Sequence, residues 1–180
     1  MIGIEIKQDM LENQVKRVYL SLGSNLGNKK INLINAKFLL ESSNHIKILK
    51  ISNYYKTDSW PDKKKPFFLN IAIEVKTNLN PVKLFKLIKN IENRLGRKKG
   101  PKNSPRTLDI DILDYDQKEI FIKFKKDNLV IPHPRMHTRN FVLLPLFEIS
   151  KTWNHPKSGK KITKLLASLK MDNLRCVKFE

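Results

Sequence analysis

Apolar residues follow two different periods along the chain, and these predict an alternation of strands and helices. Short runs that are continuously apolar, or in which apolar and polar side chains alternate, are typical of strands. Such runs predict strands at 18–23, 47–56, 67–75 and 108–113. Apolar residues three and four positions apart predict helices over 31–39 and 82–95. The second helix is flanked by Pro81 and Gly96, which favour a helix start and a helix end.

The rest of the chain predicts shorter elements: a hairpin between 119 and 131, a short helix over 141–149, a last helix over 162–169 and a closing strand over 174–179. The order strand, helix, strand, strand, helix, strand in the first part is the split βαβ pattern of a ferredoxin-like sheet. We therefore predict an α+β fold with a ferredoxin-like βαββαβ core, a mostly antiparallel sheet, helices packed on it and flexible loops. The helices are expected to cover one face, and loops and C-terminal elements to roof a site on the other.

The turn at 24–28 contains Gly27 and follows Gly23, but the segment from Gly23 to Lys29 fits neither of the phosphate-binding patterns GxxxxGK[ST] and GxGxxG. We interpret it as a structural turn with helix-capping residues.

Length and composition fit one domain. The chain has 180 residues, 40% of them hydrophobic, so 17–180 can form one core, and the polar residues 1–16 are expected to be an N-terminal extension. Cys176 is the only cysteine, which excludes an internal disulfide and a multi-cysteine zinc site. No apolar run could span a bilayer and no secretory signal is visible, so a cytoplasmic protein without a membrane partner is expected. The oligomeric state stays open, with a monomer favoured.

The formal net charge of +19 suggests nucleic-acid binding at first sight. Lysine, however, supplies 29 of the 36 basic residues and is scattered over the whole chain, as on a solvated surface. Arginine is the better bidentate ligand of phosphate, and five of the seven arginines lie between 94 and 139. The clustered arginines indicate a site for a small polyanion.

The most informative stretch is Ser104-Pro-Arg-Thr-Leu-Asp-Ile-Asp-Ile-Leu113. Asp109 and Asp111 alternate with aliphatic residues, so both carboxylates should share one face of a strand, with Cα atoms about 6.6 Å apart. Carboxylate pairs suit Mg²⁺ or Mn²⁺, two of which often act together in phosphoryl transfer. The nearby Arg106 suits a phosphate oxygen. Taken alone, the same alternation is also typical of the solvated face of an ordinary amphipathic strand.

Several separated motifs, in this order, resemble the 6-hydroxymethyl-7,8-dihydropterin pyrophosphokinase family from about Val18 to Leu169. They are Tyr19-Leu-Ser-Leu-Gly-Ser-Asn-Leu-Gly27, Tyr55-Lys-Thr57, Phe67-Phe-Leu-Asn70, Arg97 with Pro105-Arg-Thr-Leu-Asp-Ile-Asp-Ile112, and the run from Ile131-Pro-His-Pro-Arg to Phe-Glu-Ile149. Each motif is weak alone, but their joint occurrence is specific. The resemblance implies transfer of pyrophosphate from ATP to the 6-hydroxymethyl group of the dihydropterin, in folate biosynthesis.

The resemblance also implies residue roles. Asp109 and Asp111 would hold two Mg²⁺ ions, and Arg97 and Arg106 would be catalytic together with them. The implied ATP-binding residues are Lys89, Glu92, Lys99, Arg106, Ile112, His133 and Arg139. The implied pterin-binding residues are Thr57, Asp58, Trp60, Phe68, Asn70 and Phe141.

Two other classes of function compete with this interpretation. An RNA-binding module on the same topology would use the basic surface, but no Lys/Arg-Gly-Phe-Gly-Phe-type run is present, and two aspartates would repel a phosphate backbone without metals. A catalytically idle scaffold would not need Arg97 and Arg106 together with both carboxylates. We therefore expect ATP and the pterin as partners, and no nucleic acid.

Overall fold

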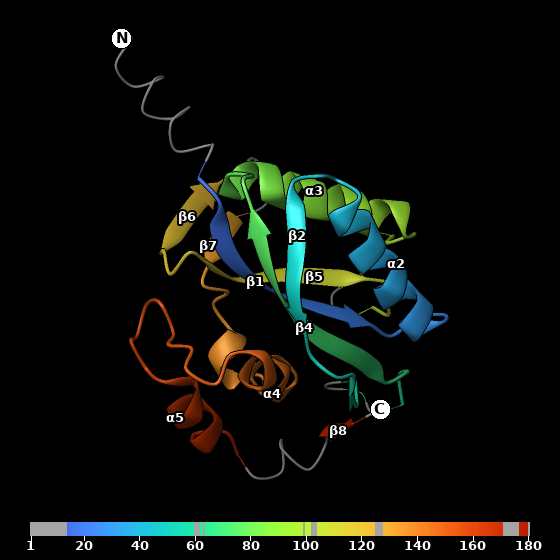
Figure 1. Cartoon of the computed structure of the whole chain (residues 1–180). Coiled ribbons are helices and arrows are strands. Elements are labelled where there is room, and N and C mark those ends of the chain that lie inside the picture. Colours follow the sequence, from blue (N-terminus) through green and yellow to red (C-terminus); the bar gives the residue numbers. More distant parts are fainter. Residues whose placement is uncertain are drawn as a thin grey trace.

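The computed structural model describes residues 14–59, 62, 64–98, 100–101, 104–124, 128–170 and 177–179, and its centre is a six-stranded sheet (Figure 1). The strands are β1 (Lys16–Ser24), β2 (Ile46–Ile51), β3 (Tyr55–Thr57), β4 (Phe68–Thr77), β5 (Asp109–Tyr115) and β8 (Val177–Phe179). Their order is β5-β1-β4-β3-β8, β2 also pairs with β4, and all these pairs are antiparallel. The predicted ferredoxin-like core is confirmed.

The predicted single strand at 47–56 is wrong, because β2 and β3 pair separately with successive parts of β4. The chain leaves the sheet at Ser52, whose N–H donates to the carbonyl of Ala72 (3.0 Å) and whose hydroxyl accepts from the N–H of Ala72 (2.9 Å). The hydroxyl replaces a backbone carbonyl, so the strand can break without leaving a buried N–H unpaired.

Helices α2 (Lys29–Glu41) and α3 (Pro81–Arg94) cover one face of the sheet, as predicted (Figure 1). Each helix begins after an asparagine, Asn28 or Asn80, whose side chain accepts an N–H of the first turn. The core on this side includes Val18, Leu20 and Leu22 of β1, Ile71, Ile73 and Val75 of β4, Leu33 and Leu40 of α2, and Leu84 and Ile88 of α3. Burial of this apolar face is the main force that holds the two helices on the sheet.

The second face is also covered by helices, which the prediction of helices on one face did not include. The short helix η1 (Met136–Thr138), α4 (Asn140–Ile149) and α5 (Ile162–Ala167) pack there, with Trp153, on Tyr19, Ala72 and Leu113 of the sheet. Helix α4 is apolar on almost every side, so it is stable only when buried. Loops and C-terminal elements thus do roof this face, while the first residues of β5 remain accessible.

The remaining predictions are largely confirmed. Strands β6 (Ile120–Lys123) and β7 (Asn128–Ile131) form the expected hairpin. Helix α5 ends at Ala167, two residues earlier than predicted, and the closing strand is described from Val177. In the described part of the chain, no helix is long and apolar enough to cross a membrane.

A buried carboxylate ties the C-terminal elements to the sheet. Asp114 of β5 accepts hydrogen bonds from the indole Nε1–H of Trp153 (2.7 Å), from the backbone N–H of Gln117 (2.8 Å) and from the Gln117 side chain. Burial raises the pKa of Asp114 although these donors act in the opposite direction.

Replacing the indole donor tests this tie. Trp153→Phe keeps a large aromatic side chain but leaves the Asp114 carboxylate without one donor, so we expect a loss of about 1.5–3 kcal/mol in the free energy of unfolding. Urea denaturation would measure this loss, provided that the dependence of the unfolding free energy on urea concentration is the same in both proteins. An unchanged midpoint would show that the hydrogen bond contributes nothing to stability.

Candidate active site

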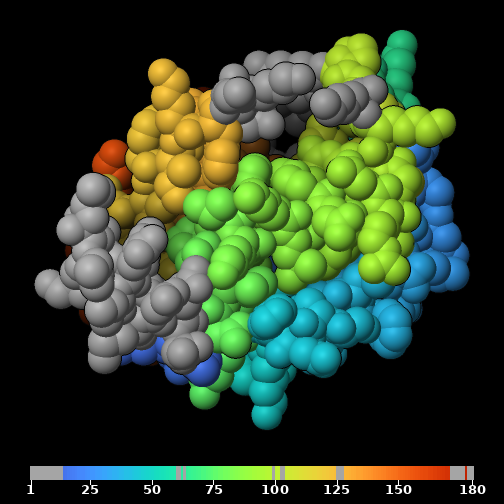
Figure 2. Space-filling view, turned by 90° about the horizontal axis from the view of Figure 1, so that it is seen from above, coloured from blue at the N-terminus to red at the C-terminus, as the bar shows by residue number. Residues whose placement is uncertain are grey.

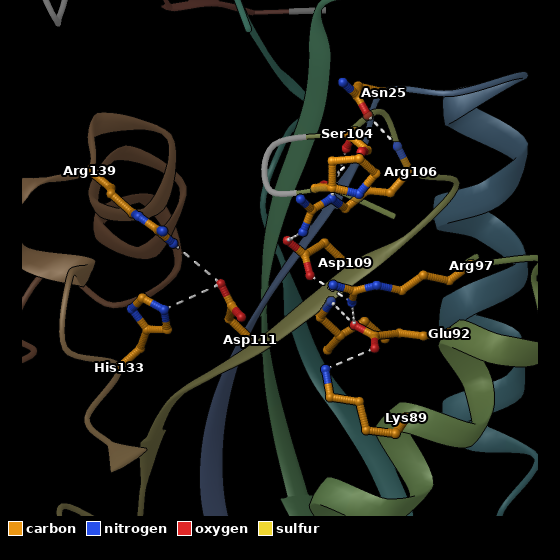
Figure 3. Close-up of polar contacts among 12 residues, drawn as sticks. Asn25, Lys89, Glu92, Arg97, Ser104, Arg106, Asp109, Asp111, His133 and Arg139 are labelled. Atoms are coloured by element: carbon orange, nitrogen blue, oxygen red, sulfur yellow. Dashed lines mark hydrogen bonds and ion pairs between the residues drawn. The ribbon is translucent and has the colours of Figure 1, made fainter. Parts of the chain in front are cut away.

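The carboxylates of Asp109 and Asp111 lie on one face at the start of β5, as the alternation predicts (Figure 3). Their side chains are 29% and 31% exposed, whereas Ile110 and Ile112 between and after them are buried. Strand β5 pairs with β1 in a register that places Gly23 opposite Asp109. The two carboxylates therefore stand on a rigid element.

Basic side chains from three different segments surround these carboxylates. Asp109 forms ion pairs with Arg97 (2.8 Å) and Arg106 (3.0 Å). Asp111 forms an ion pair with Arg139 (3.4 Å), and Nε2 of His133 lies 3.8 Å from its carboxylate. The three arginines offset the repulsion between the two carboxylates.

Glu92 of α3, which the family resemblance implies at the ATP site, is buried, although a glutamate in a helix is usually solvated. It is 1% exposed, and its carboxylate accepts hydrogen bonds from the backbone N–H of Ile110 (2.8 Å) and from Lys89 Nζ (2.9 Å). It also forms an ion pair with Arg97. Glu92 therefore anchors α3 to β5 and aims the Arg97 guanidinium at Asp109.

Burial and neighbouring charges perturb two groups of the site. Burial, and then the charge of Asp109, raises the pKa of Asp111 to about 6, against the opposing effect of Arg139. Burial, with the nearby charges of Arg139 and Arg135, lowers the pKa of His133 to about 4. The His133 ring is thus neutral at pH 7. Its Nδ1 accepts from the N–H of Arg135 (3.2 Å), which assigns the ring proton to Nε2.

A cleft of about 850 Å³ opens beside Asp111, between α3, the segment after it and β7. Figure 2 shows this face hollowed between the green surface of α3 and the orange surface that follows β7. Predicted site residues that line it are Lys89, Glu92, Arg97, Arg106, Asp111, Ile112 and His133. Residues from 89 to 133 in the sequence thus converge on one basic cleft that is large enough for a nucleotide.

A second group of predicted residues lies at the start of β4 and on β3 beside it, where only Gly23 of β1 stands between Asn70 and Asp109 across the sheet. Asn70 is buried, and its amide Nδ2 donates to the hydroxyl of Thr57 (2.9 Å), which fixes the amide orientation. Phe68 and Phe141 are half-buried. The guanidinium of Arg139 lies 5.5 Å from the centre of the Phe141 ring, so Phe141 adjoins the group around Asp111.

Gly23 leaves room for Asn70. A Cβ atom at this position would lie 2.7 Å from Oδ1 of Asn70, which is too close for any contact. The family resemblance implies that Asn70 contacts the pterin, so we expect Gly23→Ala to displace the Asn70 amide and to raise the KM for the pterin by about tenfold or more, with a smaller effect on the KM for ATP. Steady-state kinetics with each substrate varied would measure this. Equal changes in both KM values would contradict a local effect on Asn70.

Glu148 connects α4, which carries Phe141, to the segment before β3. Its carboxylate accepts hydrogen bonds from the backbone N–H (3.0 Å) and the side chain (2.9 Å) of Asn53, and from the hydroxyl of Tyr55 (2.9 Å). Burial, with Glu148 as the next cause, raises the pKa of Tyr55. This network links the helix that carries Phe141 to the strand that carries Thr57.

Some predicted residues are not brought into these groups. Trp60 and Lys99 lie outside the described residues, and Asp58 is exposed after β3. The sequence interpretation also missed Asn25, which the structure places in contact with Arg106, because the turn at 24–28 was interpreted only as a cap. Its local sequence contains no signal for this contact, since Arg106 lies 81 positions away.

The chemistry of the carboxylates fits magnesium bound together with a nucleotide. Among the described residues there is no group of three or more His, Cys, Asp or Glu side chains that could hold a metal alone. Mg²⁺ commonly takes one or two protein carboxylates and completes its shell with substrate phosphates and water. Asp109 and Asp111 can supply that protein share.

Paired carboxylates that can share Mg²⁺ with a nucleotide, and several arginines beside a cleft, fit the class of enzymes that transfer phosphoryl groups. The model of the family described as 7,8-dihydro-6-hydroxymethylpterin-pyrophosphokinase (HPPK) matches residues 19–151.

Individual relatives agree with this match. The chain is 42% identical to the 2-amino-4-hydroxy-6-hydroxymethyldihydropteridine pyrophosphokinase of Bacillus subtilis over 131 residues, which are 73% of this chain and 76% of that protein. It is 39% identical to the Aquifex aeolicus protein of the same name, over 77% of this chain and 83% of that protein. It also matches the folic acid synthesis protein fol1 of Pneumocystis carinii at 39% identity, but spans only 20% of that protein.

A solved structure of HPPK-DHPS from Plasmodium falciparum superposes with a TM-score of 0.72 at 19% identity, over 87% of this chain and 44% of that chain, which supports the fold. The chain therefore belongs to the 7,8-dihydro-6-hydroxymethylpterin-pyrophosphokinase family. It is an enzyme, an ATP-dependent pyrophosphokinase of folate biosynthesis.

Proposed function

We propose that this chain binds ATP in the cleft beside Asp111 and transfers its β,γ-pyrophosphoryl unit to the 6-hydroxymethyl oxygen of 6-hydroxymethyl-7,8-dihydropterin, leaving AMP. The main support, beside family membership, is the convergence of Arg97 and Arg106 on Asp109 and of Arg139 on Asp111, next to a cleft large enough for a nucleotide. The hydroxymethyl oxygen bonds to the β-phosphorus and its proton is released to solvent, while the bond from the β-phosphorus to the oxygen bridging to the α-phosphate breaks and that oxygen leaves with AMP.

Asp109 and Asp111 are the residues that would hold two Mg²⁺ ions. Bound there, the ions would supply charge neutralisation on the triphosphate. Arg97 and Arg106 form ion pairs of 2.8 and 3.0 Å with Asp109. They would contact the transferred group and the leaving phosphate as charge develops. The other residues proposed for the ATP site are Lys89, Glu92, Lys99, Ile112, His133 and Arg139.

The pterin site is proposed at the start of β4, across Gly23 of β1 from Asp109. Asn70, oriented by its hydrogen bond to Thr57, would recognise the hydrogen-bonding edge of the ring. Phe68 and Phe141 would stack on its faces, with Asp58 and Trp60 beside them. No side chain is assigned as an obligatory general base, so positioning and electrostatic stabilisation account for most of the acceleration.

The direct test is incubation with ATP, Mg²⁺ and the hydroxymethyl-dihydropterin, with chromatography of the nucleotides and the pterin. We expect AMP and the pterin diphosphate in equal amounts, and none of either without the pterin or with EDTA. ADP instead of AMP would contradict pyrophosphoryl transfer. Salt-sensitive RNA binding without AMP would favour the competing function.

A further inference from the structure

Asn25 lies in the turn between β1 and α2, is 2% exposed, and holds the backbone of Arg106. Its side-chain carbonyl accepts a hydrogen bond from the N–H of Arg106 (2.7 Å), which Figure 3 shows, and its own N–H donates to the carbonyl of Arg106 (3.1 Å). One residue therefore satisfies both backbone polar groups of Arg106.

The amide nitrogen of Asn25 holds a different segment, the connection between β3 and β4. Nδ2 donates to the carbonyl of Pro66 (3.3 Å) and to the hydroxyl of Ser59 (3.4 Å). The hydroxyl of Ser59 itself donates to the carbonyl of Pro66 (2.6 Å), and Ser59 is buried. This connection joins the strand of Thr57 to the strand of Asn70, the two residues of the proposed pterin site.

Asn25 is thus shared by the two parts of the site. Arg106 stands just before β5, outside the regular ladder, and its guanidinium lies 3.0 Å from Asp109. A guanidinium that must contact a substrate in one orientation loses less conformational entropy on binding if the backbone of its residue is already held in place. A buried primary amide is suited to this, because it accepts on one side and donates on the other.

We propose that Asn25 is a positioning residue, which holds the Arg106 backbone and the connection between β3 and β4 in one arrangement. It thereby sets where the Arg106 guanidinium acts relative to the pterin. This inference rests on the proposed function, since it uses the assignment of Arg106 to catalysis and of Thr57 and Asn70 to pterin binding.

Two substitutions separate the two sides of Asn25. Asn25→Ala removes the contacts of the side chain to both segments, and we expect kcat to fall about tenfold and the KM for the pterin to rise about tenfold. Ser59→Ala weakens only the connection between β3 and β4, and we expect a higher KM for the pterin with kcat within about twofold. The KM for ATP should change by less than about threefold in both.

A double mutant tests whether Asn25 acts through Arg106. In an Arg106→Ala background, Asn25→Ala should lower kcat by less than about twofold further, because the group that it positions is already gone. A purely structural role predicts instead that the two kcat losses multiply. Multiplied losses would therefore overturn the proposal, and so would a kcat that survives Asn25→Ala.

Asn32→Ala is the matched control. Asn32 also supports this turn, through hydrogen bonds from Nδ2 to the hydroxyl of Ser24 (3.1 Å) and the carbonyl of Leu26 (2.9 Å). We expect a lower melting temperature but kinetic constants within about twofold of wild type. A kcat loss equal to that of Asn25→Ala would reduce Asn25 to a turn stabiliser.

The experiment stays decisive if Asn25→Ala does not fold, and it distinguishes failure of the positioning role from failure of the proposed function. Should Asn25→Ala fail to fold, Ser59→Ala still decides, because an unchanged KM for the pterin in that variant contradicts the shared anchor. A wild-type enzyme that makes no AMP would refute the proposed function. An active wild type with unchanged kinetics in Asn25→Ala would refute only the positioning role.

Discussion

Asparagine in place of Asp109 is expected to lower kcat by about a thousandfold or more while the fold persists. A bound divalent ion contributes several kcal/mol to stabilising charge on transferring phosphates, and each 1.36 kcal/mol corresponds to about a tenfold change in rate. The Asp109 side chain is 29% exposed and its partners are arginines beside the cleft, so its removal should cost only about 0–1 kcal/mol of stability. Single-turnover AMP formation across a Mg²⁺ titration, together with a thermal melt, measures both quantities.

Asp116→Asn is the matched control for this experiment. Asp116 follows β5, and its ion pairs are with Lys16 (3.6 Å) and Lys118 (3.9 Å), away from the cleft. We expect its rate and its Mg²⁺ dependence to equal those of wild type. A cooperative melt lost in Asp109→Asn, or a rate unaffected by the substitution, would mark Asp109 as structural.

Alanine in place of Arg106 should lower kcat by about a thousandfold, and should weaken ground-state ATP binding by less than about tenfold. Arginines that contact a phosphoryl group in its transition state contribute factors on the order of 10³ or more. The Arg106→Ala variant keeps the other basic residues of the cleft, Lys89 and Arg97 among them, and these can still bind ATP. Calorimetric titration with a non-hydrolysable ATP analogue, set against single-turnover rates, separates the two effects.

Arg94→Ala serves as the control, because Arg94 is exposed at the end of α3 and does not line the cleft. It removes the same charge, so any general effect of lowering the net charge on nucleotide affinity appears in both variants. Equal losses of affinity and rate in Arg106→Ala would be incompatible with a role in the transition state.

The local sequence predicted those features that depend on short-range pattern. The alternation around Asp109 and Asp111 predicted their shared face, since side chains of a strand alternate strictly. Pro81 and the apolar stripe after it predicted α3 in the same way. The strand at 47–56 was predicted wrongly because a single hydroxyl, that of Ser52, decides where the ladder breaks, and its partner Ala72 lies 20 residues further along.

The sequence identifies charged and polar side chains, but it could not predict which of them are buried when their partners are distant along the chain. Glu92 reads as a solvated helix residue in isolation, yet it is buried because the N–H of Ile110, Lys89 and Arg97 all reach its carboxylate. A buried charge is tolerated only where such partners exist, and they come from α3, the segment after it and β5.

By itself, the sequence determined the order of the core strands and helices, apart from the break at Ser52, and the shared face of the two carboxylates, because both depend on the spacing of residues along the chain. The resemblance of several motifs in one order also indicated the family. Only the tertiary structure decided that Glu92 is an anchor, that α4 closes the second face and that Asn25 holds Arg106. Those outcomes depend on which buried donors and acceptors meet across the sheet, and the energy of a hydrogen bond depends on its geometry in space and not on separation in sequence.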